Sequence, residues 1–257
     1  MTGRWLRTLK PCSRPRLRLV CFPHAGGAAS YFVPWAQAVP GDMELLSVRY
    51  PGREDRLAEP FAESIEQLAE AIARACAPLS DRPLVFFGHS MGASVAYETA
   101  ARLAAQDRPP ALLCVSARQG PGRSQPTRSL AHLDDDRLIA EVRALGGTHA
   151  QAFDHPELRP LVLPAIRSDY RLLSTYEPRV MTLPCPVAAY CGTTDAAVPE
   201  ESVRAWQAVT RSGFTLRVFP GGHFYLADRV QDLVADVLAR ETPSRAGAGA
   251  RGPGAPV

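Results

Sequence analysis

Short apolar runs alternate with helix-period stretches along most of the 257-residue chain. The runs are almost continuously apolar, which is typical of strands that are buried on both faces of a parallel sheet. We expect strands at residues 17–22, 45–49, 84–87, 112–116, 187–191 and 216–219. Helical periodicity predicts helices at residues 64–77, 91–106, 200–210 and 228–240. Strands that alternate with helices imply right-handed crossovers, so we predict an α/β fold with a mainly parallel sheet and helices on both faces.

This alternation breaks between about residues 119 and 183. Two helical runs, at residues 134–145 and 156–176, follow each other there without a strand between them. They predict an insertion between two strands of the sheet, which is a candidate helical lid. The apolar residues of the two runs are suited to roofing a pocket, and they are equally suited to an ordinary packed helix pair. The sequence favours neither interpretation.

The chain divides into three parts by composition. We expect residues 1–15 to be an N-terminal extension and residues 16–241 to form the α/β domain, with the lid inside it. Residues 242–257 are Ala, Gly, Pro, Ser, Thr, Val and Arg with almost nothing to bury, so we expect a disordered tail.

Composition also excludes several classes of protein. The net charge is +3 and the arginines are interspersed with acidic residues, so no clustered cationic face for nucleic acid is predicted. No run of about 18 apolar residues is present, so no membrane span is expected. The six cysteines show no Cys-x-x-Cys spacing, which argues against a zinc site or a disulfide framework. With no signal-peptide pattern at the N-terminus, we expect a cytoplasmic protein.

The sequence Gly-His-Ser-Met-Gly at positions 88–92 matches the Gly-x-Ser-x-Gly nucleophile elbow. It stands between an expected strand and an expected helix, which is the context that this motif requires. The chain reverses sharply at such a turn, so the positions on both sides of the serine must be small. The motif therefore predicts that Ser90 is a nucleophile exposed above the sheet.

A serine nucleophile needs a base, and six histidines compete for that role. His89 adjoins Ser90 and would project away from it, and the histidines of the insertion lie in the candidate lid. His24 lies on a glycine-rich loop. His223 follows the expected strand at 216–219, at the sheet edge where the elbow also lies. We therefore predict that His223 is the general base.

The base in turn needs a carboxylate that orients it. Asp195 follows the expected strand at 187–191, whereas Asp228 suits the start of the last helix and Asp169 lies within a lid helix. Asp195 is preferred, and it makes the chain order Ser90, Asp195, His223. That order is the one expected of α/β-hydrolases.

An oxyanion hole requires two N–H groups that point at the reacting carbonyl oxygen. The backbone N–H of Met91 follows the nucleophile at the start of a helix. The loop at positions 23–28 follows the first apolar run and is rich in glycine and alanine. We predict that the amide of Ala25 supplies the second N–H, although this loop would also suit a simple glycine turn.

Several of these segments together resemble the type II thioesterases of polyketide and nonribosomal peptide synthesis. The resemblance spans about residues 16–240, and it rests on the 192–195 turn and on the sequences Cys-Phe-Pro-His-Ala-Gly-Gly at 21–27, Tyr-Pro-Gly-Arg-Glu-Asp-Arg at 50–56, Phe-Gly-His-Ser-Met-Gly-Ala at 87–93 and Gly-Gly-His-Phe-Tyr-Leu at 221–226. It implies an α/β-hydrolase fold and the triad Ser90, Asp195 and His223. It also implies an editing hydrolase that cleaves acyl thioesters from the phosphopantetheine of acyl or peptidyl carrier proteins. No cofactor of its own is implied, because the substrate carries the phosphopantetheine.

Two other functions remain open on the sequence. A small-molecule carboxylesterase or lipase would use the same triad, and a non-catalytic module would use the pocket only to bind acyl groups. We expect a monomer. Arg118, Arg123 and Arg128 stand at the start of the insertion, where they either meet an acidic carrier domain or form a solvated face.

Overall fold

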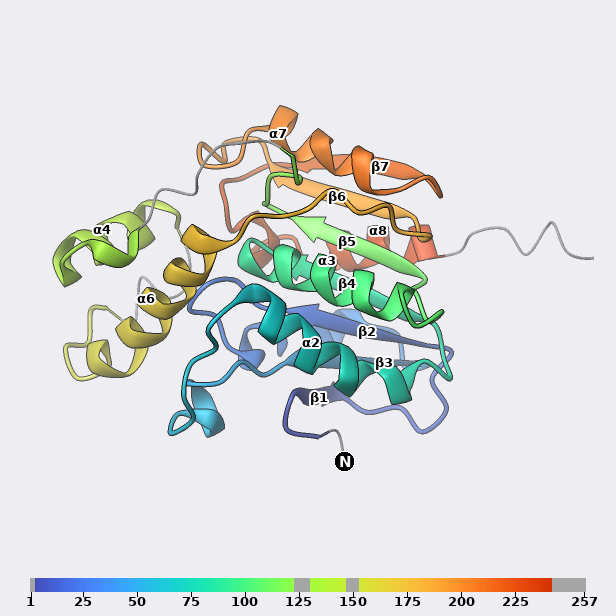
Figure 1. Ribbon diagram of the computed structural model, residues 1–257, viewed down its shortest axis with the longest axis horizontal. Helices are drawn as coiled ribbons and strands as arrows, with labels where there is room; N and C mark the ends of the chain where they lie inside the picture. Colours follow the sequence, from blue (N-terminus) through green and yellow to red (C-terminus); the bar gives the residue numbers. More distant parts are fainter. Residues whose placement is uncertain (1–2, 123–129, 147–152, 242–257) are drawn as a thin grey trace, which may run out of the picture.

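The computed structural model describes residues 3–122, 130–146 and 153–241. Its centre is a seven-stranded sheet in the order β1-β3-β2-β4-β5-β6-β7 (Figure 1). β1 is antiparallel to β3, and the other neighbouring pairs are parallel. The strands are β1 (Leu6–Lys10), β2 (Leu17–Phe22), β3 (Met43–Val48), β4 (Leu84–His89), β5 (Leu112–Ser116), β6 (Val187–Gly192) and β7 (Phe214–Phe219). The predicted α/β class with a mainly parallel sheet is confirmed.

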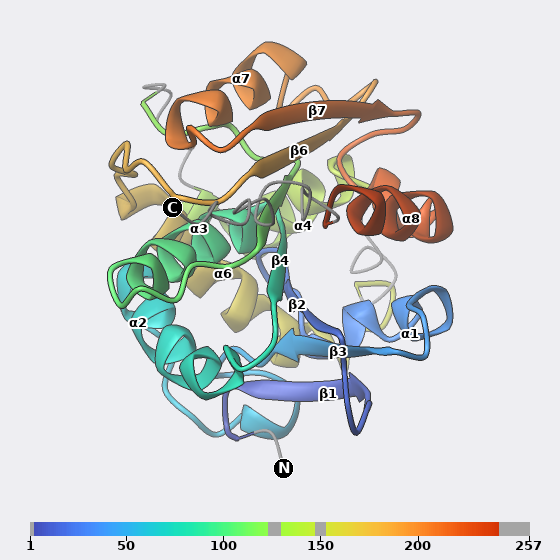
Figure 2. The ribbon, with the colours of Figure 1, turned by 90° about the vertical axis from the view of Figure 1, so that its right-hand side faces the viewer.

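Helices cover both faces of the sheet, with α2 and α3 on one side and α1 and α8 on the other (Figure 2). Burial along β2 follows from this arrangement. Val20 and Phe22 belong to the apolar cluster beneath α2 and α3, whereas Leu19 and Cys21 belong to the cluster beneath α1 and α8. The helices are α1 (Trp35–Ala38), α2 (Ile65–Cys76), α3 (Met91–Ala104), α4 (Asp135–Ala144), α6 (Arg159–Thr175), α7 (Glu200–Arg204) and α8 (Val230–Glu241).

The structure departs from the sequence-based expectations at β1 and α7, and it adds the short helix α1. β1 lies within residues 1–15, which were expected to be an extension, but it pairs with β3 at the edge of the sheet. Only Leu6 is fully buried in β1, so an edge strand of this kind lacks the continuous apolar run of the inner strands. The expected helix at 200–210 divides into α7 and a 3-10 helix, Ala205–Val209. Residues 242–257, the expected tail, lie outside the described residues.

The predicted insertion between β5 and β6 contains α4 and α6, which lie beyond the carboxyl ends of the strands (Figure 1). The two helices pack against each other through a cluster of their own. Its members include Leu138, Ile139 and Val142 of α4 and Leu163 and Ile166 of α6. The packed helix pair that the sequence left as one alternative is therefore present.

A bilayer-spanning helix is not found in the part of the chain that the structure describes, since none of its helices combines the required length with sufficient apolar character.

Candidate active site

The predicted elbow is a strained turn between β4 and α3. Ser90 adopts φ 53° and ψ −118°, in a region that residues other than glycine rarely occupy. The N–H of Ser90 donates a hydrogen bond to the carbonyl oxygen of Ser116 at 2.8 Å, which ties the turn to the end of β5. The turn therefore raises the Ser90 hydroxyl above the carboxyl ends of the strands.

The glycines on both sides of Ser90 are required by close backbone contacts. A Cβ atom at Gly88 would lie 2.3 Å from the carbonyl oxygen of Gly92. A Cβ atom at Gly92 would lie 2.0 Å from the carbonyl oxygen of Phe22, at the end of β2. These contacts explain in physical terms why both glycines of the motif are present.

The three predicted side chains, from positions far apart in the chain, meet at this turn. The distance between His223 Nε2 and Ser90 Oγ is 3.0 Å, and that between His223 Nδ1 and Asp195 Oδ2 is 2.8 Å. Because a carboxylate only accepts hydrogen bonds, His223 donates from Nδ1, and its Nε2 is free to accept from the Ser90 hydroxyl. Asp195 and His223 are almost completely buried. The geometry is that of a proton relay from serine to histidine, with a carboxylate behind it.

The loops that carry Asp195 and His223 are joined to each other. Thr194 N–H donates to the carbonyl oxygen of Gly221 at 2.9 Å, and Gly221 N–H donates to Thr193 Oγ1 at 3.2 Å. The second oxygen of Asp195 accepts hydrogen bonds from the N–H groups of residues 197 and 198, at 3.0 and 3.2 Å. These contacts fix the distance between the carboxylate and the imidazole, and they stabilise the charge on Asp195.

His89 lies behind the triad, as a residue that packs away from the nucleophile. Its Nδ1 is 2.9 Å from Ser116 Oγ, which in turn is 2.7 Å from the hydroxyl of Tyr225. Burial lowers the pKa of His89 well below its usual value, and the neighbouring His223 lowers it further. His89 is therefore neutral, and it adds no charge beside the imidazole of His223.

A model of the thioesterase domain family matches residues 17–240 of the chain. This range contains β2 to β7 and all three residues of the proton relay. The chain belongs to the thioesterase family. The thioesterase is therefore a hydrolase of thioesters, and the predicted class of enzyme is confirmed.

Relatives and solved structures support the same family. Thioesterase PikA5 of Streptomyces venezuelae is 45% identical over 240 residues, which cover 92% of this chain and 85% of that protein. Gramicidin S biosynthesis protein GrsT of Aneurinibacillus migulanus is 32% identical, and the match covers 90% of this chain and 91% of that protein. The structure of the type II thioesterase BorB from the borrelidin biosynthetic cluster is 38% identical with a TM-score of 0.88, over 94% of this chain and 99% of that chain. The predicted resemblance to type II thioesterases is confirmed.

Two of the cavities that the described residues form open on the proton relay. The larger has a volume of about 510 Å³ and is lined by Ser90, His223 and lid residues that include Leu145, Tyr170 and Leu173. The smaller, of about 20 Å³, also reaches Ser90 and His223 and is lined by Ala25. The lid therefore roofs a pocket as well as forming a packed helix pair, so both interpretations of the insertion hold.

The two residues predicted to supply the oxyanion hole lie close to Ser90. Met91 is the first residue of α3, where helix N–H groups have no partner within the helix. Ala25 follows β2 and lines the small cavity with Ser90. In the described part of the thioesterase, neither amide donates a hydrogen bond to another residue. Both N–H groups are thus available to a ligand.

Arg118 lies beside the cavity that opens on the proton relay. It is half-buried and lines the larger cavity together with Ser90. The role of Arg118 in docking a carrier domain stays a prediction. Arg123 and Arg128 lie outside the described residues.

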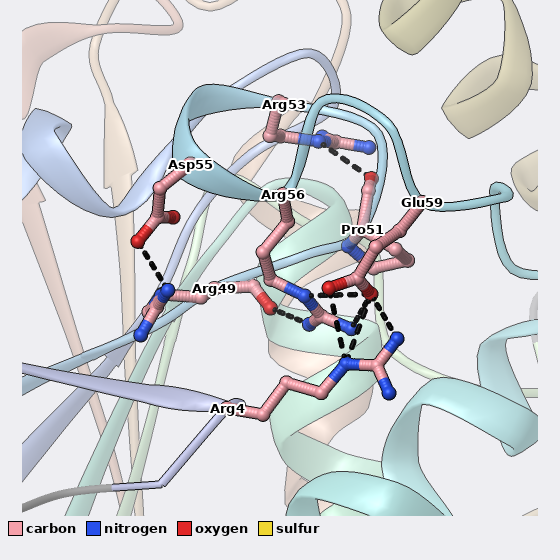
Figure 3. Close-up of polar contacts among 7 residues, drawn as sticks. All are labelled: Arg4, Arg49, Pro51, Arg53, Asp55, Arg56 and Glu59. Carbon is pink, nitrogen blue, oxygen red and sulfur yellow. Dashed lines mark hydrogen bonds and ion pairs between the residues drawn. The ribbon is translucent and has the colours of Figure 1, made fainter.

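The Pro-Gly-Arg-Glu-Asp-Arg segment forms a dense polar network beside β1 (Figure 3). Arg56 donates to Glu59 at 2.6 Å and to the carbonyl oxygen of Arg49 at 2.5 Å, and its guanidinium carbon lies 4.2 Å from the centre of the Trp5 ring. Hydrogen bonds from Arg56 and Arg4 hold the pKa of Glu59 at about 2. Arg56 thus fastens the segment to the N-terminal strand.

Sequence reasoning missed one partner of this segment. Arg53 donates to the carbonyl oxygen of Pro51 at 3.3 Å (Figure 3). It also pairs with Asp169 of α6, which the sequence analysis rejected as a catalytic acid. The only signal for Arg53 was its place in the segment that carried the family resemblance. No local pattern marks an ion pair between residues so far apart in the chain.

Proposed function

We propose that this thioesterase, as a monomer, removes acyl groups from the phosphopantetheine arm of acyl or peptidyl carrier proteins and thereby edits polyketide or nonribosomal peptide synthesis. The proposal is supported by GrsT, which is named as a gramicidin S biosynthesis protein, and by BorB, a type II thioesterase from the borrelidin biosynthetic cluster. The observation that carries it is the relay of Ser90, His223 and Asp195 at the floor of a lid-covered cavity of about 510 Å³. A cavity of this size accommodates an acyl chain with part of its carrier arm.

In the proposed mechanism, His223 Nε2 takes the proton of Ser90 as Ser90 Oγ attacks the thioester carbonyl carbon. Asp195 keeps the proton on His223 Nδ1 and stabilises the imidazolium that forms. The oxyanion accepts hydrogen bonds from the amides of Met91 and Ala25. The C–S bond then breaks, and the pantetheine sulfur leaves with the proton from His223. Water activated by His223 hydrolyses the acyl-enzyme in the same way and releases the acid.

We expect the enzyme to prefer an acyl carrier protein over the matched acyl-pantetheine, and acyl-pantetheine over an alkyl ester of the same acid. Each truncation removes remote contacts, and a loss of ~1.4 kcal/mol of such binding lowers kcat/KM by about tenfold. Steady-state kinetics with one acyl group on all three carriers measures the order. A preference for the alkyl ester would identify a small-molecule esterase of the same fold and contradict the proposal.

A further inference from the structure

Arg53 and Asp169 form a buried ion pair between the loop after β3 and the lid helix α6. The pair is bidentate, with 2.6 Å from Arg53 Nη1 to Asp169 Oδ2 and 2.9 Å from Nη2 to Oδ1. The side chains are only 9% and 3% exposed. Burial disfavours the charge on Arg53, but the attraction of Asp169 outweighs it and the pKa of Arg53 is raised. Buried ion pairs of this kind contribute little net free energy to folding. The presence of this pair between the loop and the lid therefore needs an explanation other than stability.

The pair also holds the backbone on which Ala25 lies. The N–H of Gly26 donates to Asp169 Oδ2 at 2.7 Å, and Arg53 Nη1 donates to the carbonyl oxygen of Gly27 at 3.1 Å. Gly26 has φ +76°, and a Cβ atom there would lie 2.3 Å from Cγ1 of Ile166 in α6. The lid helix and the loop are therefore in close contact at the residue that follows Ala25.

We propose that Arg53 and Asp169 are positioning residues that hold the Ala25 amide in place as an oxyanion donor. The inference rests on the proposed function, because it assumes that the Ala25 N–H binds the oxyanion. Neither side chain needs to touch the substrate. Donors that are fixed before the reaction lose no energy to reorganisation, and a displacement of about 1 Å in such a site lowers the rate by about 100-fold.

The experiment compares Asp169→Asn with the wild type on an acyl-pantetheine thioester. An asparagine has one acceptor oxygen in place of two, so it cannot keep the Gly26 bond together with both bonds of the fork, and its NH₂ group would face a donor of Arg53. We therefore expect kcat to fall by about 10- to 100-fold with KM changed by less than about twofold. Labelling of Ser90 by a fluorophosphonate is expected to slow in parallel, because its phosphonyl oxygen uses the same amides. Arg53→Lys keeps the positive charge but loses the bidentate hydrogen bonding of the guanidinium, so a smaller fall in kcat is expected than for Asp169→Asn.

Glu44→Gln is the matched control, because it breaks another ion pair, the half-buried one of Arg18 and Glu44. This pair lies at the amino ends of β2 and β3, whereas the site lies at the carboxyl ends of the strands. Glu44→Gln is expected to lower the Tm with no change in kcat. A change in KM alone for Asp169→Asn, or a fall in kcat that Glu44→Gln reproduces, would overturn the inference. Full activity of Asp169→Asn would overturn it too, whereas the proposed function depends on Ser90 and is tested separately.

A different observation supports a second inference, at Arg118. Its backbone is held at the end of β5, where Ala117 has φ 49° and the indole N–H of Trp206 donates to the Arg118 carbonyl oxygen at 2.7 Å. The Arg118 side chain makes no ion pair or hydrogen bond with any other residue in the described ranges. Glu141 lines the same cavity, but it is not paired with Arg118. Burial lowers the pKa of Arg118.

Two other arginines with little exposure have carboxylate partners. Arg53 pairs with Asp169, and Arg18 is 2.8 Å from Glu44. A partly desolvated guanidinium without such a partner costs free energy, which a bound acceptor can offset. We propose that Arg118 donates a hydrogen bond to an oxygen atom on the acyl chain, so that the enzyme favours oxygenated acyl groups over alkyl ones. This deepens the proposed function by naming its substrate class.

Arg118→Met tests this inference with two probes of equal length, 3-hydroxybutyryl- and butyryl-pantetheine. We expect the ratio of kcat/KM for the hydroxylated over the alkyl probe to fall by about tenfold or more, the value of one hydrogen bond to a charged group. Arg118→Lys is expected to restore part of the ratio. An unchanged ratio would overturn the subsite, whether both probes slow together or neither does, and the thioesterase assignment would stand.

Discussion

Ser90→Ala is expected to lower kcat for acyl-pantetheine hydrolysis by roughly 10⁴- to 10⁶-fold. The Ser90 hydroxyl is the only atom of the relay placed to form the acyl-enzyme, and its side chain contacts His223 at 3.0 Å. Alanine keeps the Cβ atom that Ser90 already carries at φ 53°, so the elbow is expected to persist with a nearly unchanged Tm. Steady-state kinetics and thermal unfolding measure both quantities.

The same variant separates catalysis from binding. Ser90→Ala is expected to bind acyl-pantetheine as the wild type does and to resist labelling by a fluorophosphonate. Near-normal turnover by this variant would show that Ser90 is not the nucleophile, and it would contradict the proposed mechanism. An unlabelled wild-type enzyme that holds an acyl ligand would indicate a binding module instead.

Asp195→Asn is expected to lower kcat by about 10⁴-fold. The two N–H groups at residues 197 and 198 point at Oδ1 of Asp195, so an asparagine places its oxygen there and turns its NH₂ group toward His223. That NH₂ group donates to His223 Nδ1 and forces the proton onto Nε2. The imidazole then cannot accept the proton of Ser90, although the fold is intact.

Asp228→Asn is the matched control for this prediction. Asp228 follows His223 in the chain and was weighed as the acid from the sequence, but it is exposed in the structure. Activity near that of the wild type is expected. A loss for Asp228→Asn equal to that for Asp195→Asn would contradict the assignment of the carboxylate, and so would an Asp195→Asn enzyme within about tenfold of the wild type.

The elbow could be predicted because its causes are local. Glycines are needed on both sides of Ser90 because a Cβ atom there would lie only 2.3 or 2.0 Å from a backbone oxygen. An apolar strand and a helix stand directly on either side of the turn. The positions of Asp195 and His223 could also be inferred, because the carboxyl ends of parallel strands meet at one edge of the sheet. β1 escaped prediction, since an edge strand with one buried leucine has no distinctive period.

The sequence by itself determined the α/β class, the elbow and the chain order of the three candidate residues, because periodicity and turn sterics act over a few residues. Only the tertiary structure decided that Asp169 of the lid binds Gly26 and Arg53, and that Arg118 faces the cavity. These contacts join segments that are distant in the chain, and the free energy of a buried charge depends on what surrounds it rather than on its neighbours in sequence.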